Sequence, residues 1–307
     1  MTSFSEEKLD SSAGYFSGEP GATLHNGEWT IVRKLGWGSR SSTWLAVSSK
    51  DPNNFEAIKI FTVDATQDRG SANELDLLQG PLKDDFQTLP SLRSSFYVES
   101  AKGKHLALIL HVLGGSLESF RLQHGGSLPV AAVKKIVADV LESLAVLQKK
   151  KIVHGAVNAE NILFSGSQQG SDITAAVAAS PNAQAEQVTD AQGNVYNVVK
   201  SQPFSPESVD DISGEALYLS NFGHARPEQG DVSSKSDILA LGRTAYLLLT
   251  GSQYSGTPEA IEQSLTSSGK LAGDEISATA VFLGSLLATN PAQRLSAVDL
   301  LGNNWLQ

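Results

Sequence analysis

The sequence predicts an α+β protein in which the first third is rich in strands and the remainder is mainly helical. Short runs of β-branched and aromatic residues recur between residues 29 and 112 and are separated by Gly or polar turns, a pattern typical of an antiparallel sheet. Beyond residue 128, apolar residues recur every three to four positions instead, which is the spacing of helices that face a core. A chain of 307 residues is long enough to bury a sizeable core, or to form two lobes that share a cleft.

Composition limits the classes of function. The net charge of −10 and the pI near 5.1 disfavour nucleic acid or an anionic membrane as a main partner, and no apolar run reaches membrane-spanning length. The chain has no cysteine, so it can form neither a disulfide framework nor a metal–thiolate site. Its polar, acidic beginning lacks the apolar core of a signal peptide. We therefore expect a monomer in the cytoplasm or nucleus, with protein partners that the sequence does not identify.

A glycine-containing hairpin is predicted near the beginning of the chain. Residues 1–26 are rich in Ser, Gly and Glu and are predicted to be a flexible leader. Two β-prone segments, 29–34 and 42–47, then flank Gly36 and Gly38. Glycines allow backbone amides to approach an anion closely, but an ordinary hairpin turn explains the same residues.

A lysine interrupts the next apolar strand, which is predicted over residues 55–61. Lys59 must reach either solvent or a carboxylate. Glu74 lies in the amphipathic helical segment 72–78 and is the candidate partner. The alternative is an edge strand from which the lysine points into water.

The second part of the chain contains two predicted core helices separated by an insert. Strands over 96–99 and 105–112 come first, and apolar spacing then predicts a long helix over 130–148. Residues 165–215 are mainly Ser, Gln, Ala and Gly with little periodicity, which is the composition of a disordered insert. A short β-like run, Asn194–Val199, interrupts it. A strongly apolar helix is predicted over 236–250.

The residues between the long helix and the insert carry the main chemical motif. Residues 151–164 read KIVHGAVNAENILF, in which two β-prone segments flank a polar loop. The spacing of His154 and Asn161 resembles the protein-kinase catalytic loop, H-R-D-L-x-x-x-N. Gly155 stands in place of the Arg, and Ala156 stands in place of the catalytic Asp.

Further motifs follow in the order found in protein kinases. They are A-I-K at 57–59, N-F-G at 221–223 in place of D-F-G, D-x-x-x-L-G from Asp237, and R-L-S-A from Arg294. This order resembles the protein kinase superfamily. The stretches KLGWG, HVLGGSL and LPVAAVKKI resemble the SR-protein kinase family within it, and that family also carries a long insert between its lobes.

The resemblance implies a bilobal kinase-like domain over residues 27–307. Its N-lobe would cover about 27–112, and its C-lobe, with the insert, about 113–307. Lys59 and Glu74 would form the ion pair that orients nucleotide phosphates, Leu110 would be the gatekeeper, and the backbone from His111 to Leu113 would face an adenine ring. His111 itself is interpreted as a structural polar residue. The implied ATP site consists of Gly36, Gly38, Lys59, Glu74, Leu110, His111, Leu113 and Asn161.

Two substitutions remove chemistry that the resemblance would otherwise imply. Ala156 has no group to accept a hydroxyl proton, and Asn221 offers a neutral oxygen where Mg²⁺ favours a carboxylate. We therefore expect no intact catalytic residue, weak or absent Mg²⁺ binding by Asn161 and Asn221, and ATP binding that is weak and independent of metal.

The segment after Gly223 is also unusually short. Residues 226–228 read RPE and resemble the end of A-P-E, only three positions after Gly223, which leaves no room for a peptide-substrate platform. The resemblance implies that Glu228 pairs with Arg294.

Three functions remain open on this reading. The first is a pseudokinase that scaffolds or regulates protein partners. The second is a low-activity, atypical serine/threonine kinase that phosphorylates Ser/Arg-rich proteins. The third is a degenerate product with no function beyond folding. Other carboxylates are poor substitutes for those lost: Glu160 occupies a position where the family carries Glu in any case, and Asp210, Asp211 and Glu215 form an acidic stretch typical of a solvated surface.

Overall fold

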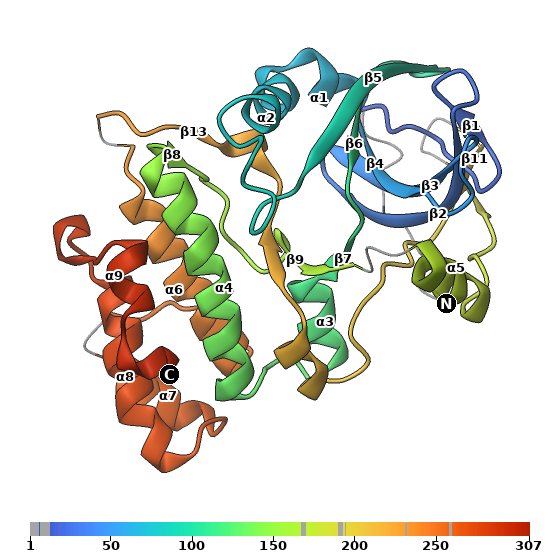
Figure 1. The fold of residues 1–307 in the computed structure, drawn as a ribbon. Coiled ribbons are helices and arrows are strands. Elements are labelled where there is room, and N and C mark those ends of the chain that lie inside the picture. The colour runs from blue at the N-terminus through green and yellow to red at the C-terminus, as the bar shows by residue number, and fades with distance from the viewer. Residues whose placement is uncertain are drawn as a thin grey trace. The chain divides into compact units, whose positions relative to one another are not determined.

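A computed structural model describes residues 6, 13–166, 170–189, 193, 195–230, 232–257 and 260–307. The chain forms two compact units (Figure 1). Unit 1 comprises residues 1–84, 90–115 and 165–205, and unit 2 comprises residues 85–89, 116–164 and 206–307. The first part of the insert therefore belongs to unit 1, whereas the sequence assigned the whole insert to the C-lobe.

Unit 1 is built on an antiparallel sheet, as predicted. Six strands lie in the order β1-β2-β3-β4-β6-β5, so β4, which carries Lys59, is paired on both sides. The strands are β1 (Thr23–Leu24), β2 (Trp29–Gly38), β3 (Ser41–Ser48), β4 (Phe55–Phe61), β5 (Leu92–Ser100) and β6 (Gly103–Leu110).

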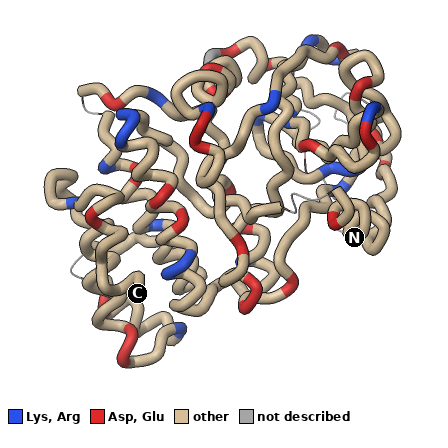
Figure 2. The backbone as a smooth tube through the Cα atoms, in the orientation of Figure 1, with Lys and Arg blue, Asp and Glu red and all other residues tan. Residues whose placement is uncertain are grey.

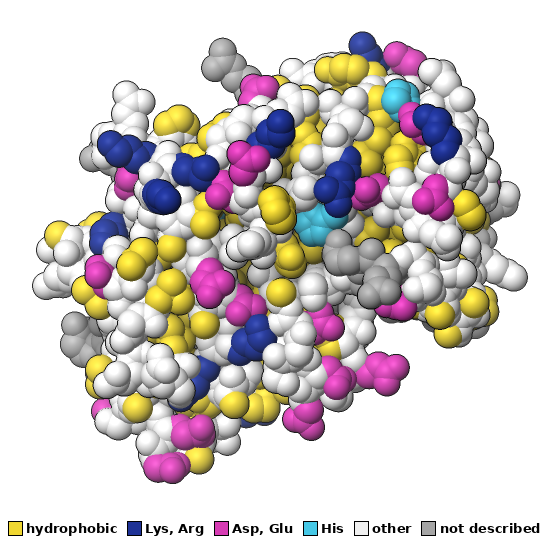
Figure 3. All heavy atoms as spheres, in the orientation of Figure 1, with side chains coloured by type: hydrophobic (Ala, Val, Ile, Leu, Met, Phe, Trp, Pro, Cys, Tyr) yellow, Lys and Arg dark blue, Asp and Glu magenta, His cyan; other side chains and the backbone are white. Residues whose placement is uncertain are grey.

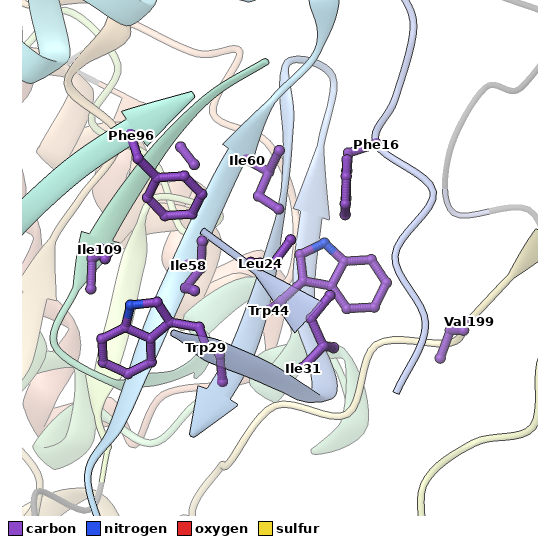
Figure 4. Close-up of a cluster of buried hydrophobic side chains, with 12 residues drawn as sticks. Phe16, Leu24, Trp29, Ile31, Trp44, Ile58, Ile60, Phe96, Ile109 and Val199 are labelled. Carbon is purple, nitrogen blue, oxygen red and sulfur yellow. The ribbon is translucent and has the colours of Figure 1, made fainter. Parts of the chain in front are cut away.

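The two faces of this sheet bury different side chains, because successive residues of a strand point to opposite faces. Ile58 and Ile60 of β4 belong to a buried cluster that contains two tryptophans, Trp29 and Trp44 (Figure 4). Phe61 faces the other way and packs with residues from α1 (Val63–Gln67) and β6. The first cluster comprises Phe16, Leu24, Trp29, Ile31, Trp44, Ala46, Ile58, Ile60, Phe96, Ala107, Ile109 and Val199.

Helix α2 (Arg69–Gln79) contains the segment that the sequence predicted as a helix. It begins where the Asp68 carboxylate accepts a hydrogen bond from the Gly70 backbone N–H, so the first turn is capped by a side chain. The same carboxylate is paired with Arg40, whose charge, with these hydrogen bonds, holds the pKa of Asp68 below its usual value despite partial burial. This cap fixes the beginning of the helix that carries Glu74.

The predicted flexible leader is packed against unit 1 over its described part. Tyr15 and Phe16 are buried, and the Tyr15 hydroxyl donates a hydrogen bond to the Gly38 carbonyl at 2.9 Å. The prediction is wrong for residues 13–26, because two adjacent aromatic side chains bury enough apolar surface to hold an otherwise polar segment in place. Residues 1–5 and 7–12 of the leader lie outside the described residues.

The predicted disordered insert also contains regular structure. Helix α5 (Gly170–Ala179) is followed by an antiparallel pair, β10 (Glu186–Thr189) and β11 (Val195–Val198). Ile173 and Val199 are buried, so a few apolar residues tie a polar segment to the sheet. The prediction of disorder is wrong for α5 and β10, whereas β11 lies within the predicted β-like run at 194–199. Residues 167–169, 190–192 and 194 of the insert lie outside the described residues.

Unit 2 is mainly helical and is organised around α4 (Val130–Lys149), which confirms the helix predicted over 130–148. The apolar stripe of α4 is fully buried, and the helix packs against α6 and α9. Two short strand pairs, β8 with β13 and β9 with β12, carry the loops of the candidate site. The remaining elements are α3 (Leu117–Gln123), β8 (Ile152–Val153), β9 (Ile162–Ser165), β12 (Leu217–Leu219), β13 (Arg226–Pro227), α6 (Lys235–Thr250), α7 (Ile261–Ser268), α8 (Gly273–Leu287) and α9 (Ala297–Leu301).

Charged residues of both signs are spread along the backbone (Figure 2). On the face shown in Figure 3, acidic, basic and apolar side chains are likewise interspersed. Among the described residues, no helix combines the length and hydropathy needed to cross a bilayer.

Candidate functional site

In unit 1, Lys59 and Glu74 form the predicted ion pair. The Lys59 Nζ lies 2.8 Å from both carboxylate oxygens of Glu74, and the side chains are only 11% and 3% exposed. Because β4 is a central strand, Lys59 cannot point into water from a sheet edge, and that alternative is wrong. The pair places a fixed positive charge on the sheet face opposite the tryptophan cluster.

The two glycines lie inside strand β2, whereas the hairpin turn is formed by Ser39 and Arg40. Gly38 directly precedes this turn and pairs with Ser41 across it, so the ordinary-turn explanation stays open for Gly38, whereas Gly36 lies within the strand. Neither has a positive φ, and a Cβ added to Gly36 or Gly38 would meet no atom within 4 Å. Open space beside the backbone of both residues is what the approach of another molecule requires.

The segment after β6 uses His111 structurally, as expected. Its backbone N–H donates to the Ser91 carbonyl at 3.1 Å, and its Nδ1 accepts from the Ser91 N–H at 2.9 Å. Burial, helped by the charge of Arg93, lowers the pKa of His111 to about 4, so the ring is neutral at pH 7. Leu110 ends β6, and Leu113 begins β7 (Leu113–Ser116).

In unit 2, a buried carboxylate holds the predicted catalytic loop. Asp237 in the first turn of α6 accepts hydrogen bonds from the backbone N–H groups of His154 at 2.7 Å and Gly155 at 2.9 Å. The side chain is buried, and this burial raises its pKa even though both hydrogen bonds oppose the shift. Asp237, the first residue of the D-x-x-x-L-G motif, therefore anchors the backbone of the loop.

The His154 ring connects this loop to the segment after β12. Its Nδ1 accepts from the Ala156 N–H at 3.2 Å, so its Nε2 carries the proton and donates to the Ser220 carbonyl at 3.0 Å. The ring also lies edge-on to Phe222 at 5.0 Å between centroids. His154 thus fixes the position of the N-F-G residues relative to the loop.

The three positions that would carry phosphoryl-transfer chemistry are joined by amide hydrogen bonds. Asn161 Nδ2 donates to the Ala156 carbonyl at 2.8 Å, and Asn161 Oδ1 accepts from Asn221 Nδ2 at 3.0 Å. Asn221 adopts a left-handed conformation, with φ at 71°, which Asn tolerates better than most residues. The Asn221 side-chain N–H therefore points at Asn161 Oδ1, which is the oxygen that would coordinate a cation.

This donor set does not fit Mg²⁺, which prefers carboxylate and water oxygens. Among the described residues, no group of three or more His, Cys, Asp or Glu side chains is placed to hold a metal ion. Two further carboxylates do not supply the missing ligand: Glu160 is exposed, and the Asp211 carboxylate accepts from the N–H and hydroxyl of Ser208.

Gly155 is required by its conformation and by its neighbour. Its φ is +76°, and a Cβ at this position would lie 2.9 Å from the His224 carbonyl oxygen. The chain returns to β8 immediately after the turn at residues 222–224, since β13 pairs directly with β8. The short segment therefore occupies the space into which a side chain at position 155 would extend.

The predicted ion pair between Arg294 and Glu228 does not form. Glu228 instead accepts hydrogen bonds from the N–H and hydroxyl of Ser234, next to the beginning of α6, and these bonds keep its pKa below the usual value. The prediction is wrong because the short segment brings Glu228 to this helix end. Arg294 donates to the carbonyls of Ala288, Lys235 and Thr289.

Sequence reasoning missed two contacts in unit 1. Tyr15 holds the Gly38 carbonyl, and the only signal for it was an aromatic pair in a polar segment. The buried Lys34 is paired with Glu6 at 3.0 Å, and no sequence pattern indicated that contact.

Comparison with known proteins identifies the class of protein to which this chain belongs. The family model for the protein kinase domain matches residues 29–306. The chain therefore belongs to the protein kinase family.

Within that family the chain is SRPK-like. It is 33% identical over 158 residues to SRSF protein kinase 3 of Mus musculus, which covers 49% of this chain and 28% of the mouse protein. It is 30% identical over 146 residues to the serine/threonine-protein kinase SRPK of Physarum polycephalum, which covers 46% of this chain and 34% of that protein. These alignments thus span about a third or less of the relatives' lengths.

Gly155→Ala should destabilise unit 2 by about 2–4 kcal/mol, because it adds a close contact to the strain of a positive φ. Gly269→Ala is a matched control, since Gly269 has φ +63° and no atom within 4 Å of an added Cβ, and it should cost only about 1 kcal/mol. Urea denaturation of both variants measures the difference. Equal losses would show that the His224 contact carries no weight.

His111 should make the protein sensitive to acid. Its folded pKa of about 4 lies below the unfolded value of 6.5, so the unfolded chain binds more protons between these values and stability falls as pH drops from 6.5 towards 4. The full effect is about 3 kcal/mol. His111→Gln should flatten this part of the pH profile of unfolding.

His224→Gln is the matched control, because His224 is exposed. Its profile of unfolding free energy against pH should follow that of the parent. Identical profiles for the parent and His111→Gln would contradict the prediction.

Proposed function

We propose that the protein is a pseudokinase of SR-protein kinase type, which binds ATP weakly without metal and acts as a scaffold or regulator of protein partners. The observation that carries this proposal is the hydrogen bond from Asn221 Nδ2 to Asn161 Oδ1. It joins two positions that would hold Mg²⁺ in an active kinase, and it turns one of them into a hydrogen-bond donor.

The loss of a base supports the same proposal. The Ala156 side chain is a methyl group, and only its backbone is engaged, through the Asn161 amide. Removing a positioned base typically lowers the rate by about 10²–10⁴-fold. Loss of the metal carboxylate acts on a different part of the mechanism, since it removes the neutralisation of phosphate charge, so restoring one part does not compensate for the other.

Unit 1 supports the retention of nucleotide. The ion pair of Lys59 with Glu74 holds the ammonium in place, and the backbone of Gly36 and Gly38 is open to an approaching group. Without Mg²⁺, the phosphates would rely on Lys59 and on backbone amides for neutralisation. Binding is then weak, and its consequence is stabilisation of the folded protein by mass action.

The alternative is a low-activity serine/threonine kinase that phosphorylates Ser/Arg-rich proteins. Membership of the protein kinase family and the intact ion pair favour it. The similar protein of Physarum polycephalum is itself named a serine/threonine-protein kinase. We propose that the protein is a monomer in the cytoplasm or nucleus. A chain without cysteine suits the reducing conditions of these compartments.

Asn221→Asp separates the two functions through its response to metal. For the parent, we expect ATP to raise the melting temperature equally with and without Mg²⁺. Asn221→Asp should add a rise that depends on Mg²⁺, because it restores a carboxylate ligand beside Asn161. Differential scanning fluorimetry measures both effects, and Asn158→Asp is the control, since Asn158 lies in the same loop and only caps backbone N–H groups.

A strictly Mg²⁺-dependent rise in the parent would favour the enzyme, and no response to ATP would favour a nucleotide-free scaffold. Transfer of radiolabelled phosphate to a Ser/Arg-rich peptide completes the comparison. We expect none from the parent and none from the Ala156→Asp, Asn221→Asp double variant, because the peptide platform remains missing. Turnover by the parent would refute the pseudokinase proposal.

A further inference from the structure

Helix α5 packs on the same sheet face as Lys59. Ala57 and Lys59 are two positions apart in β4, so both side chains point to one face, and Leu45 is the cross-strand partner of Ala57. Ile173 of α5 is buried in one cluster with Leu35, Leu45, Ala57 and Val112, and Val177, one helical turn later, packs against that cluster. The apolar side of α5 therefore covers the part of this face next to the ion pair.

Both ends of α5 are fixed on the sheet. At the beginning, Gly170 packs so closely on the turn between β3 and β4 that an added Cβ would collide with the carbonyl oxygen of Asn53. At the end, the buried Arg33 of β2 donates to the carbonyls of Val177 at 3.1 Å and Ser180 at 2.6 Å. A cation at the last carbonyls of a helix is favourable, and burial lowers the pKa of this guanidinium from its usual value. In Figure 1, α5 lies below β2 in unit 1.

The rest of the insert binds the edge of β2 beyond Thr30, where β2 is no longer paired with β1. The Asn182 side chain donates to the Val32 carbonyl at 2.7 Å, and the Gln202 N–H donates to the Lys34 carbonyl at 2.8 Å. Both carbonyls lie just before Gly36 in β2. The insert thus contacts β2 on its face and along its edge.

We propose that α5 is an intramolecular cover that competes with nucleotide for this face of unit 1. A strand rises about 3.3 Å per residue, so Ala57 lies roughly 7 Å from Lys59 along β4. A nucleotide whose phosphates pair with Lys59 is longer than this and extends over the surface that Ile173 occupies. The inference rests on the proposed nucleotide binding and adds that the insert lowers its affinity.

Removing the apolar contacts of α5 tests the proposal. Ile173→Ala with Val177→Ala shortens the two side chains that reach the cluster and keeps helix-favouring residues. Binding of a fluorescent N-methylanthraniloyl ATP, without Mg²⁺, should become about tenfold tighter than in the parent. Thr174→Ala is the matched control, because Thr174 is an exposed residue of the same helix, and its affinity should equal that of the parent.

A second variant covers the case in which the double variant does not fold. Arg33→Gln releases the end of α5 without opening the apolar cluster, and it should also tighten binding. Hydrogen exchange of the unmodified chain adds an independent readout, since ATP should speed exchange of α5 amides if it displaces the helix.

The outcomes separate this inference from the proposed function. Unchanged or weaker nucleotide binding by the variants, with binding by the parent, overturns the cover and leaves the proposed nucleotide binding standing. Slower exchange of α5 with ATP also overturns the cover. Absence of binding in the parent and in both variants overturns both proposals, whereas binding by the variants alone supports the cover and shows that the intact chain is closed to nucleotide.

Discussion

The catalytic-type loop depends on one buried carboxylate. Burial raises the pKa of Asp237, and the two backbone N–H groups of His154 and Gly155 donate to its carboxylate and offset the cost of desolvation. Without this acceptor, the buried backbone N–H of His154 would be unsatisfied, at a cost of about 1–3 kcal/mol. The loop therefore keeps its backbone geometry for a reason of stability, and that reason does not involve the chemistry of position 156. The loop framework can therefore persist whichever side chain occupies position 156.

Two departures from the kinase pattern form one structural change. Gly155 stands where an Arg is usual, and the segment after Gly223 is short. The structure joins them, because the His224 carbonyl oxygen lies only 2.9 Å from the position of a Cβ added at residue 155, and β13 pairs with β8 directly afterwards. An Arg at this position cannot coexist with the short return of the chain. Gly155 and the short segment are therefore mutually consistent. Such agreement between a local residue choice and the global fold is expected of a sequence that folds.

Much of the fold could be predicted because the local residue pattern of most helices and strands indicates their type. Strand β4 and helix α4 have clear periodicities, and Lys59 in an apolar strand indicated either solvent or a carboxylate partner, of which the structure shows the second, Glu74. The leader and the insert could not be predicted, because a few residues determine their placement: Tyr15 and Phe16 in one case, Ile173 and Val199 in the other. Composition averages over such residues, so it indicates disorder where single buried side chains hold the chain.

The site shows the same limit. The identities at positions 156 and 221 could be read directly, and Asp237 was placed correctly. The pairing of Arg294 with Glu228 was not, because it assumed a segment of ordinary length. A short segment brings Glu228 to the Ser234 N–H group instead, and a motif transfers correctly only when the chain between its parts keeps its path.

The retained ion pair is weak evidence for nucleotide by itself. Lys59 and Glu74 are both buried, and removing one partner of a buried pair costs about 3–5 kcal/mol because the other charge is left uncompensated. Stability alone can therefore preserve the pair after any activity is lost. The glycines provide a separate argument. Neither Gly36 nor Gly38 has a positive φ, and a Cβ on either would meet no atom within 4 Å, although Gly36 adjoins an irregularity in the pairing of β2 with β3 and Gly38 adjoins the hairpin turn. Glycine within a strand is unfavourable by roughly 0.5–1 kcal/mol relative to Ala, so these two open positions favour an approaching molecule more than the ion pair does.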